Sequence, residues 1–203
     1  MHILLVDDHA IVRAGLRRLL ATATPCKIRE ASTGPEALEQ LRAGRADLVI
    51  LDLNLPGLGG LELLRRMLQE EPGLPVLVLT MHAEPVYAKR ALEAGARGYV
   101  SKNVAPEEML AAVRRVGAGG RYVEAEIAQD LALAGTSPMQ QLSERDLEIM
   151  RLLADGRSLQ QIADLLGIAY KTAANLCTQI KAKLGVGRTA DLVRLSTQLS
   201  DRI

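Results

Sequence analysis

The chain has 203 residues, a formal net charge of +1 and a hydrophobic content of 48%, with no Phe and no Trp. This length allows one large domain or two small ones, and the core must be aliphatic. The near-neutral charge gives no support by itself for a nucleic-acid partner, and no apolar run reaches the ~18 residues of a membrane span. The first residues enter a strand pattern without a secretory signal, and Cys26 and Cys177 lie far apart. We therefore expect a cytoplasmic protein with two reduced thiols and no membrane contact.

Short apolar runs alternate with amphipathic patterns over the first 117 residues. The runs, rich in Val, Ile and Leu, predict strands at 3–6, 27–31, 48–51, 76–79 and 97–100. The amphipathic patterns predict helices at 10–22, 34–43, 59–70, 84–94 and 105–117. Five such units with short connections predict an α/β fold, a doubly wound five-stranded parallel sheet with right-handed crossovers.

The helix predicted at 10–22 illustrates how these helices should pack. Its apolar positions, expected to be buried, are Ile11, Leu16, Leu19 and Leu20. Its basic positions, expected to be exposed, are Arg13, Arg17 and Arg18. The helix should thus lie on the sheet with its arginines in solvent.

The pattern changes after residue 120. A mixed segment at 121–141 is predicted to be a linker with a short helix near 124–134, and its clearest break is Gly135 to Pro138. From residue 142 onward the chain shows helical patterns only. We therefore predict a first domain at 1–120, the linker, and a second, all-α four-helix domain at 142–203.

The second domain carries a helix–turn–helix pattern. Its helices are predicted through about 154, at 159–166, at 171–184 and at 189–199. Ser143 can cap the first, and Ser158 with Gln161 forms a capping box for the second. Between Ile162 and Ile168, a small alanine inside the helix, a glycine in the turn and an apolar residue after it have the spacing of a helix–turn–helix.

Polar side chains follow four of the five predicted strands. Asp7 and Asp8 follow the first, Asp52 the third and Thr80 the fourth, while Lys102 comes just after the fifth. Because parallel strands share one carboxyl edge, these side chains should meet there. Three neighbouring carboxylates repel one another unless a cation lies among them, and Mg²⁺ prefers such oxygen ligands. The pattern therefore predicts a Mg²⁺-assisted phosphoryl site.

These motifs, taken together, resemble a two-domain response regulator of the NarL/FixJ type. The receiver motifs are Leu5-Val6-Asp7-Asp8-His9, Leu51-Asp52-Leu53-Asn54-Leu55-Pro56-Gly57, Leu79-Thr80 and Gly98-Tyr99-Val100-Ser101-Lys102. The output motifs are Leu142-Ser143-Glu144-Arg145-Asp146 with Glu148-Ile149, Ile162-Ala163 with Leu166-Gly167-Ile168, and Lys183-Leu184-Gly185-Val186. The resemblance implies a flavodoxin-like receiver domain followed by a LuxR-type helix–turn–helix DNA-binding domain.

The resemblance also assigns the chemistry at the strand ends. Asp52 would accept a phosphoryl group from a sensor histidine kinase, since a carboxylate can serve as the nucleophile. Mg²⁺ would be bound directly by Asp8 and Asp52, through water by Asp7, and by the backbone carbonyl of Asn54. Asp52 would then store phosphate rather than turn over a substrate, so we expect a regulator and not an enzyme. His9 and His82 are expected to be surface residues, because Mg²⁺ prefers oxygen.

Three further residues would form the switch of the receiver. Lys102 would pair with a phosphoryl oxygen, Thr80 would hydrogen-bond another, and Tyr99 would repack as Thr80 moves. Many receivers have a proline in a cis peptide after this lysine, whereas this chain has Asn103. A cis bond there would cost ~3 kcal/mol, so the geometry of this peptide stays open.

The helix at 171–184 would be the recognition helix that lies in the major groove of DNA. Its apolar stripe is Ala173, Leu176, Ile180 and Leu184. The expected DNA contacts are Lys171, Thr172, Asn175, Gln179, Lys181 and Lys183, of which Asn175 or Gln179 could read adenine. The chain departs from the family pattern at Ala169, which cannot cap this helix, at Ala174 in place of a basic residue, and at Leu176 in place of histidine.

Several alternatives remain open from the sequence alone. The helix at 189–199 presents Leu192, Leu195 and Leu199, either to a second copy in a phosphorylation-dependent homodimer on promoter DNA or to its own domain. The main function expected is a phosphorylation-controlled transcription regulator. The alternative is a phosphorylation-dependent protein-interaction module whose output domain is degenerate. A metal-dependent phosphatase is a weaker option, because the chain ends in a helix–turn–helix.

Overall fold

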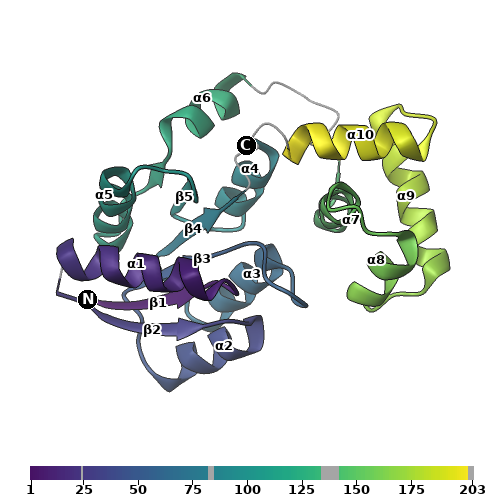
Figure 1. The fold of residues 1–203 in the computed structure, drawn as a ribbon. Coiled ribbons are helices and arrows are strands. Elements are labelled where there is room, and N and C mark those ends of the chain that lie inside the picture. The colour runs from purple at the N-terminus through teal and green to yellow at the C-terminus, as the bar shows by residue number, and fades with distance from the viewer. Residues whose placement is uncertain (24, 82–84, 134–141, 201–203) are drawn as a thin grey trace. The chain divides into compact units, whose positions relative to one another are not determined.

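The computed structural model describes residues 1–23, 25–81, 85–133 and 142–200 (Figure 1). The chain forms two compact units, which we call the α/β unit, Met1–Leu131, and the helical unit, Ala132–Ile203. Within the described ranges, no helix has both the length and the apolar character needed to cross a bilayer. His82, expected at the surface, lies outside the described residues.

A parallel six-stranded sheet forms the centre of the α/β unit, in the order β2-β1-β3-β4-β5-β6. The strands are β1 (His2–Val6), β2 (Lys27–Ala31), β3 (Leu48–Leu51), β4 (Val76–Thr80), β5 (Gly98–Ser101) and β6 (Tyr122–Val123). The five predicted strands are confirmed, and the order of the first five is the flavodoxin-like one. The predicted strand count of five was wrong, because β6, within the segment predicted as a linker, pairs with β5. A strand of two residues is too short to leave a periodic pattern.

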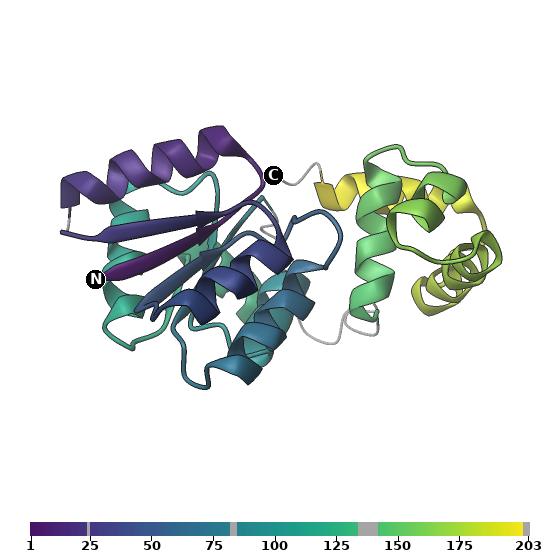
Figure 2. The ribbon, with the colours of Figure 1, turned by 90° about the horizontal axis from the view of Figure 1, so that it is seen from below.

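Helices cover both faces of this sheet (Figures 1 and 2). They are α1 (Ala10–Ala23), α2 (Gly34–Ala43), α3 (Gly60–Glu70), α4 (Pro85–Glu93), α5 (Pro106–Gly117) and α6 (Ala125–Leu133). Successive strand side chains point to opposite faces, so Ile3 and Leu5 pack with α1 and α5 while Leu4 and Val6 pack with α2, α3 and α4. The short helix predicted near 124–134 is confirmed as α6.

The packing of α1 departs from the sequence prediction at two positions. Ile11 was expected to be buried but is 87% exposed, because nine residues at 3.6 per turn put it about 180° around the helix from the buried Leu20. Arg13 was expected to be exposed, yet its side chain is only 16% exposed and pairs with Glu30 of β2. The side of α1 that faces the sheet carries Leu20, which is buried, and Leu16 and Leu19, which are half-buried, so Ile11 does not belong to it.

The helical unit contains α7 (Glu144–Ala154), α8 (Leu159–Leu165), α9 (Tyr170–Leu184) and α10 (Thr189–Ser200). Ser143 caps α7, and the capping box of Ser158 and Gln161 begins α8, as predicted. Gly167 has a φ of +62° in the turn between α8 and α9, a conformation that glycine adopts without strain. These features confirm the helix–turn–helix.

Candidate functional site

The carboxyl ends of β1, β3, β4 and β5 bring the predicted polar residues to one edge of the sheet. Asp52 N–H donates to the carbonyl of Val6 at 2.8 Å, which sets the residue after β3 beside the end of β1. Lys102 N–H donates to the carbonyl of Thr80 at 2.8 Å, which sets the residue after β5 beside the end of β4. The parallel ladder thus continues one residue beyond the strands and fixes the backbone of the site.

The ammonium of Lys102 bridges two carboxylates at this edge. Its Nζ lies 2.7 Å from Oδ2 of Asp7 and 2.7 Å from Oδ2 of Asp52. The side chain of Asp52 is fully buried, and those of Asp7 and Lys102 are 4% and 8% exposed. Ion pairs removed from water in this way interact much more strongly than pairs at the surface.

Burial and hydrogen bonding set the protonation behaviour of this pair. Burial raises the pKa of Asp52, and hydrogen bonds from Lys102 and from the backbone N–H of Asn54 only partly oppose it. Burial alone would lower the pKa of Lys102, but its hydrogen bonds to Asp52 and Asp7 outweigh burial and raise it. Lys102 therefore keeps its proton, and Asp52 is a poorly hydrated carboxyl that a nearby cation would stabilise in its charged form.

The carboxylates form a cluster suited to a divalent cation. One ligand atom from each of Asp7, Asp8, Asp52 and His9 lies within 4.8 Å of the others. The side chain of Asp8 is 33% exposed and that of His9 is 61% exposed, with His9 Nδ1 2.7 Å from Asp8 Oδ1. Three carboxylates carry more charge than the single ammonium of Lys102 balances, and oxygen donors are the ligands that Mg²⁺ prefers. The donor set therefore fits a hard divalent cation.

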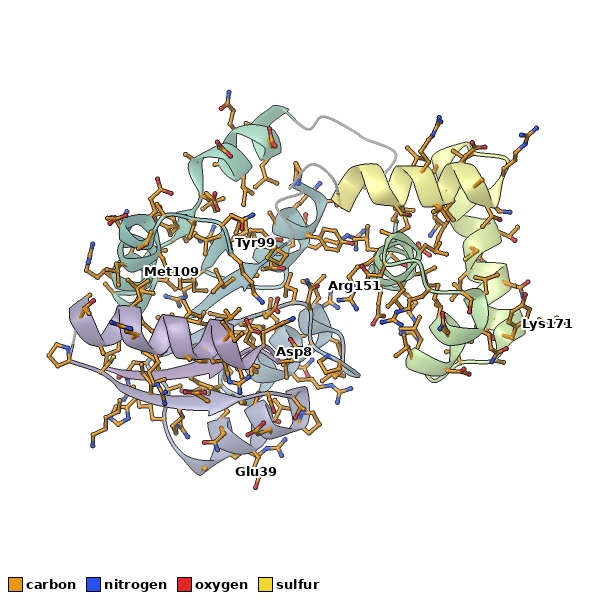
Figure 3. All side chains as sticks on the ribbon, in the orientation of Figure 1. Asp8, Glu39, Tyr99, Met109, Arg151 and Lys171 are labelled. Carbon is orange, nitrogen blue, oxygen red and sulfur yellow. The ribbon has the colours of Figure 1, made fainter. Side chains whose placement is uncertain are left out.

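The other residues predicted for this site are Asn54, Thr80 and Tyr99. Asn54 N–H donates to Oδ1 of Asp52 at 3.0 Å, while the role of its carbonyl as a metal ligand stays a prediction. Thr80 and Tyr99 are both fully buried, and Tyr99 lies inside the α/β unit whereas Asp8 lies beside the strand ends (Figure 3). The peptide between Lys102 and Asn103 is trans.

Two contacts near the site were not predicted from the sequence. Arg13 of α1 donates through Nη1 to the backbone carbonyl of Asp7. Glu124, between β6 and α6, accepts the backbone N–H of Ser101 through Oε2 at 2.7 Å. The expected strand order, with β2 beside β1, would have indicated Glu30 of β2 as a partner for Arg13. No feature of the sequence indicated the role of Glu124.

Helix α9, the expected recognition helix, presents its polar residues on one side. Lys171, Thr172, Asn175 and Gln179 are exposed, and Lys171 projects outward from the start of the helix (Figure 3). Of the predicted apolar stripe, Ala173 and Ile180 are buried, while Leu176 and Leu184 are only half-buried. Cys177, which was not placed in the stripe, is buried instead. Ala169 makes no capping hydrogen bond, as expected.

Lys183 does not lie where the sequence analysis placed it. Its ammonium pairs with Oδ2 of Asp146, which is 1% exposed, so Lys183 is half-buried rather than exposed, and its contact with DNA stays a prediction. Periodicity put Lys183 on the polar side of α9, but the start of α7 covers that end of the helix. Lys181 is half-buried.

Two other residues of the helical unit define its internal packing. Arg145 of α7 donates through Nη2 to the carbonyl of Leu166 at 2.8 Å and so supports the turn between α8 and α9. Leu192, expected on a dimer surface or against its own domain, is fully buried within the chain. The side chain of Leu199 lies outside the described residues.

Two protein families match this chain. Residues 3–114 match the family described as the response regulator receiver domain. Residues 140–196 match the family of bacterial regulatory proteins called the luxR family. The first match covers the site at the strand ends, and the second covers the helix–turn–helix.

Curated relatives match over nearly their whole length. The chain is 36% identical to the response regulator UvrY of Escherichia coli strain K12, with 97% of this chain and 93% of the relative covered. It is 42% identical to the transcriptional activator protein ExaE of Pseudomonas putida, with 98% and 96% covered. The response regulator GacA of Pseudomonas aeruginosa is 36% identical, with 97% and 95% covered.

Solved structures match as well. One is RcsB from Salmonella enterica serovar Typhimurium bound to promoter rprA in the presence of the phosphomimetic BeF3−, with a TM-score of 0.77, 25% identity and both chains fully covered. Another is a two-component response regulator of the LuxR family from Aurantimonas, with a TM-score of 0.63 and 41% identity over 65% of this chain and 95% of the other.

Proposed function

We propose that this chain, which belongs to the response regulators that join a receiver domain to a LuxR-type DNA-binding domain, stores a phosphoryl group on Asp52 and thereby controls its binding to promoter DNA. The observation that carries this proposal is the buried Asp52, held 2.7 Å from the ammonium of Lys102 among carboxylates that fit a divalent cation. A sensor histidine kinase would supply the phosphoryl group, and the chain would act in the cytoplasm.

The reaction moves one phosphoryl group between two side chains. A carboxylate oxygen of Asp52 forms a new P–O bond as the P–N bond to the imidazole of the donor histidine breaks, and the leaving imidazole takes up a proton. Bound at Asp7, Asp8 and Asp52, Mg²⁺ would offset the negative charge of the transferring group. Lys102, already beside Asp52, would exchange the carboxylate for a phosphoryl oxygen, and the Thr80 hydroxyl would donate to another.

The helical unit supplies the proposed output. Lys171 at the exposed start of α9 is suited to phosphate contacts, and Asn175 and Gln179 are suited to base edges in the major groove. Lys181 would add a weaker contact, because it is half-buried. The RcsB structure that this chain resembles is bound to a promoter, which supports DNA as the partner. A homodimer would place two such helices on paired half-sites.

Mass spectrometry tests the input half of this proposal. The full chain, treated with acetyl phosphate and Mg²⁺, should gain one phosphoryl group. Asp52→Asn should gain none, because the amide cannot act as the nucleophile, while Asp155→Asn, at an exposed position of the helical unit, should react like the wild type. An Asp52→Asn variant that gains the same mass would refute the assignment.

A gel-shift titration tests the output half. The phosphorylated chain should bind fragments of bacterial promoter DNA with an affinity that falls as salt is raised. A second candidate, a phosphorylation-dependent protein-interaction module, is favoured by the internal pairing of Lys183 and by the uncapped start of α9. Phosphorylated chain that binds no DNA at low salt would decide for that second candidate.

A further inference from the structure

Glu124 connects the start of α6 to the end of β5 through hydrogen bonds. Its backbone N–H donates to the carbonyl of Tyr99 at 3.1 Å, and its carboxylate Oε2 accepts the backbone N–H of Ser101 at 2.7 Å. Its own carbonyl accepts the N–H of Ala128, in the first turn of α6, at 2.9 Å. One residue therefore holds two positions of β5 and begins the helix that follows.

The side chain of Glu124 makes a hydrogen bond in the place where the sheet would otherwise have a backbone one. β6 ends at Val123, so its backbone offers no partner to the N–H of Ser101. The carboxylate takes that place, and a hydrogen bond to a charged acceptor is stronger than the backbone bond that it replaces. Apolar contacts extend the attachment, because Ile127 of α6 is 2% exposed in the same cluster as Tyr99, with Leu131 packed against it.

This attachment lies one peptide bond from the phosphoacceptor site. Ser101 directly precedes Lys102, whose ammonium contacts Asp52 and whose N–H is bonded to the carbonyl of Thr80. When Lys102 exchanges the Asp52 carboxylate for a phosphoryl oxygen, the contacts change at the residue that shares a peptide with Ser101. The phosphoryl group also adds negative charge beside the ammonium of Lys102, the residue that follows Ser101, and like charges such as the phosphoryl group and the Glu124 carboxylate disfavour one another.

We propose that Glu124 is a positioning residue that couples phosphorylation of Asp52 to α6, the helix that leads in sequence toward the DNA-binding domain. The bond between Ser101 and Glu124 holds α6 on β5 in the unphosphorylated chain, and it weakens when Asp52 is phosphorylated. This coupling rests on the proposed function of Asp52 and adds to it a route out of the receiver. In this proposal the segment 122–133 carries the effect of phosphorylation from β5 toward the DNA-binding domain and does not merely connect the two domains.

Hydrogen exchange measured by mass spectrometry on the full chain tests this coupling. Acetyl phosphate with Mg²⁺ should raise amide exchange in residues 122–133 of the wild type about tenfold, as expected for the loss of one charge-assisted hydrogen bond. Glu124→Ala should show this faster exchange already without phosphate, and phosphorylation should change it less than about twofold. Glu126→Ala removes an equally charged but exposed residue of α6 and should behave like the wild type.

The outcomes separate the coupling from the proposed function. A wild-type chain that takes up no phosphoryl group overturns both, whereas a Glu124→Ala variant that takes up phosphate and responds like the wild type overturns the coupling alone. Exchange raised throughout the α/β unit would also overturn it, because a merely structural role predicts that result. Should Glu124→Ala not fold, Glu124→Gln decides, since its amide oxygen keeps the acceptor without the charge: intermediate exchange supports the coupling and wild-type exchange overturns it.

Discussion

The strand-end edge of the α/β unit and the recognition helix α9 use lysine in opposite ways. At the strand ends, Lys102 is buried between Asp7 and Asp52 and its charge is compensated inside the protein. At the start of α9, Lys171 is exposed and extends into solvent, where an external anion can compensate its charge (Figure 3). The first arrangement suits a switch, whose charges rearrange among themselves. The second suits a binding surface, whose charge is compensated when a partner binds.

Lys183 shows that position on the chain does not decide between these two uses. It belongs to the recognition helix, as Lys171 does, yet its ammonium pairs with the buried Asp146. Burial of the partner carboxylate, rather than membership of a DNA-binding element, determines which lysine is structural. The comparison therefore predicts distinct effects when each of these lysines is removed.

The largest effect is expected at Lys102. Lys102→Met leaves Asp7 and Asp52 buried without their cation, so the free energy of unfolding of the α/β unit should fall by about 3 kcal/mol or more at pH 7. Mg²⁺ should restore part of this loss, because it can replace the missing charge at the same carboxylates. Urea denaturation followed by circular dichroism, with and without Mg²⁺, measures both effects. Lys27→Met, which removes an exposed lysine of β2, should change stability by less than about 0.5 kcal/mol, and an equal loss in both variants would contradict the comparison.

A smaller, pH-dependent effect is expected at Asp146. Burial by itself would raise the pKa of Asp146, but hydrogen bonds from Lys183 and from Ser143 outweigh it and lower the pKa below 3.8. The carboxylate therefore stabilises the helical unit at pH values above the unfolded pKa of about 3.9, and this contribution is lost as the pH falls through the lower folded value. Asp146→Asn should cost about 1–2 kcal/mol at pH 7 and less than that at pH 3.

Urea titrations of the variant and the wild type at pH 7 and pH 3 measure this difference. Asp164→Asn is the control, since Asp164 is exposed and its carboxylate accepts a hydrogen bond from the exposed side chain of Gln160. Its stability should change little at either pH. If Asp146→Asn were as stable as the wild type at pH 7, Lys183 would not be held by its partner, and the distinction between internal and external lysines would fail for α9.

The two regions also differ in how well the sequence predicted them. Asp7, Asp52, Thr80 and Lys102 could be placed at one edge because they follow parallel strands, and strand order leaves them little freedom. Each buried run also fixes its own register, since the apolar residues must stay covered. The topology thus determines the site before any side chain is placed.

The contacts that the sequence did not predict depend on packing between elements. Lys183 and Asp146 are far apart in sequence and meet only because α7 covers the end of α9. β6 consists of two residues, and Glu124 completes its ladder with a side chain. Periodicity describes one element at a time, so it cannot report such contacts.

The smallest effect, and the sharpest test of the comparison, is expected in the salt dependence of DNA binding. Lys171→Ala should reduce the slope of log K against log salt by about 1, because one phosphate contact is lost. Lys183→Met should leave that slope unchanged, although it lowers the stability of the helical unit. Affinities measured by fluorescence anisotropy at several salt concentrations, with both variants phosphorylated and folded, give the two slopes. Equal slope changes would mean that Lys183 leaves Asp146 to contact DNA. The pairing of Lys183 with Asp146 in the free chain would then be replaced by a contact with DNA. Burial of Asp146 would no longer distinguish a structural lysine from a binding one.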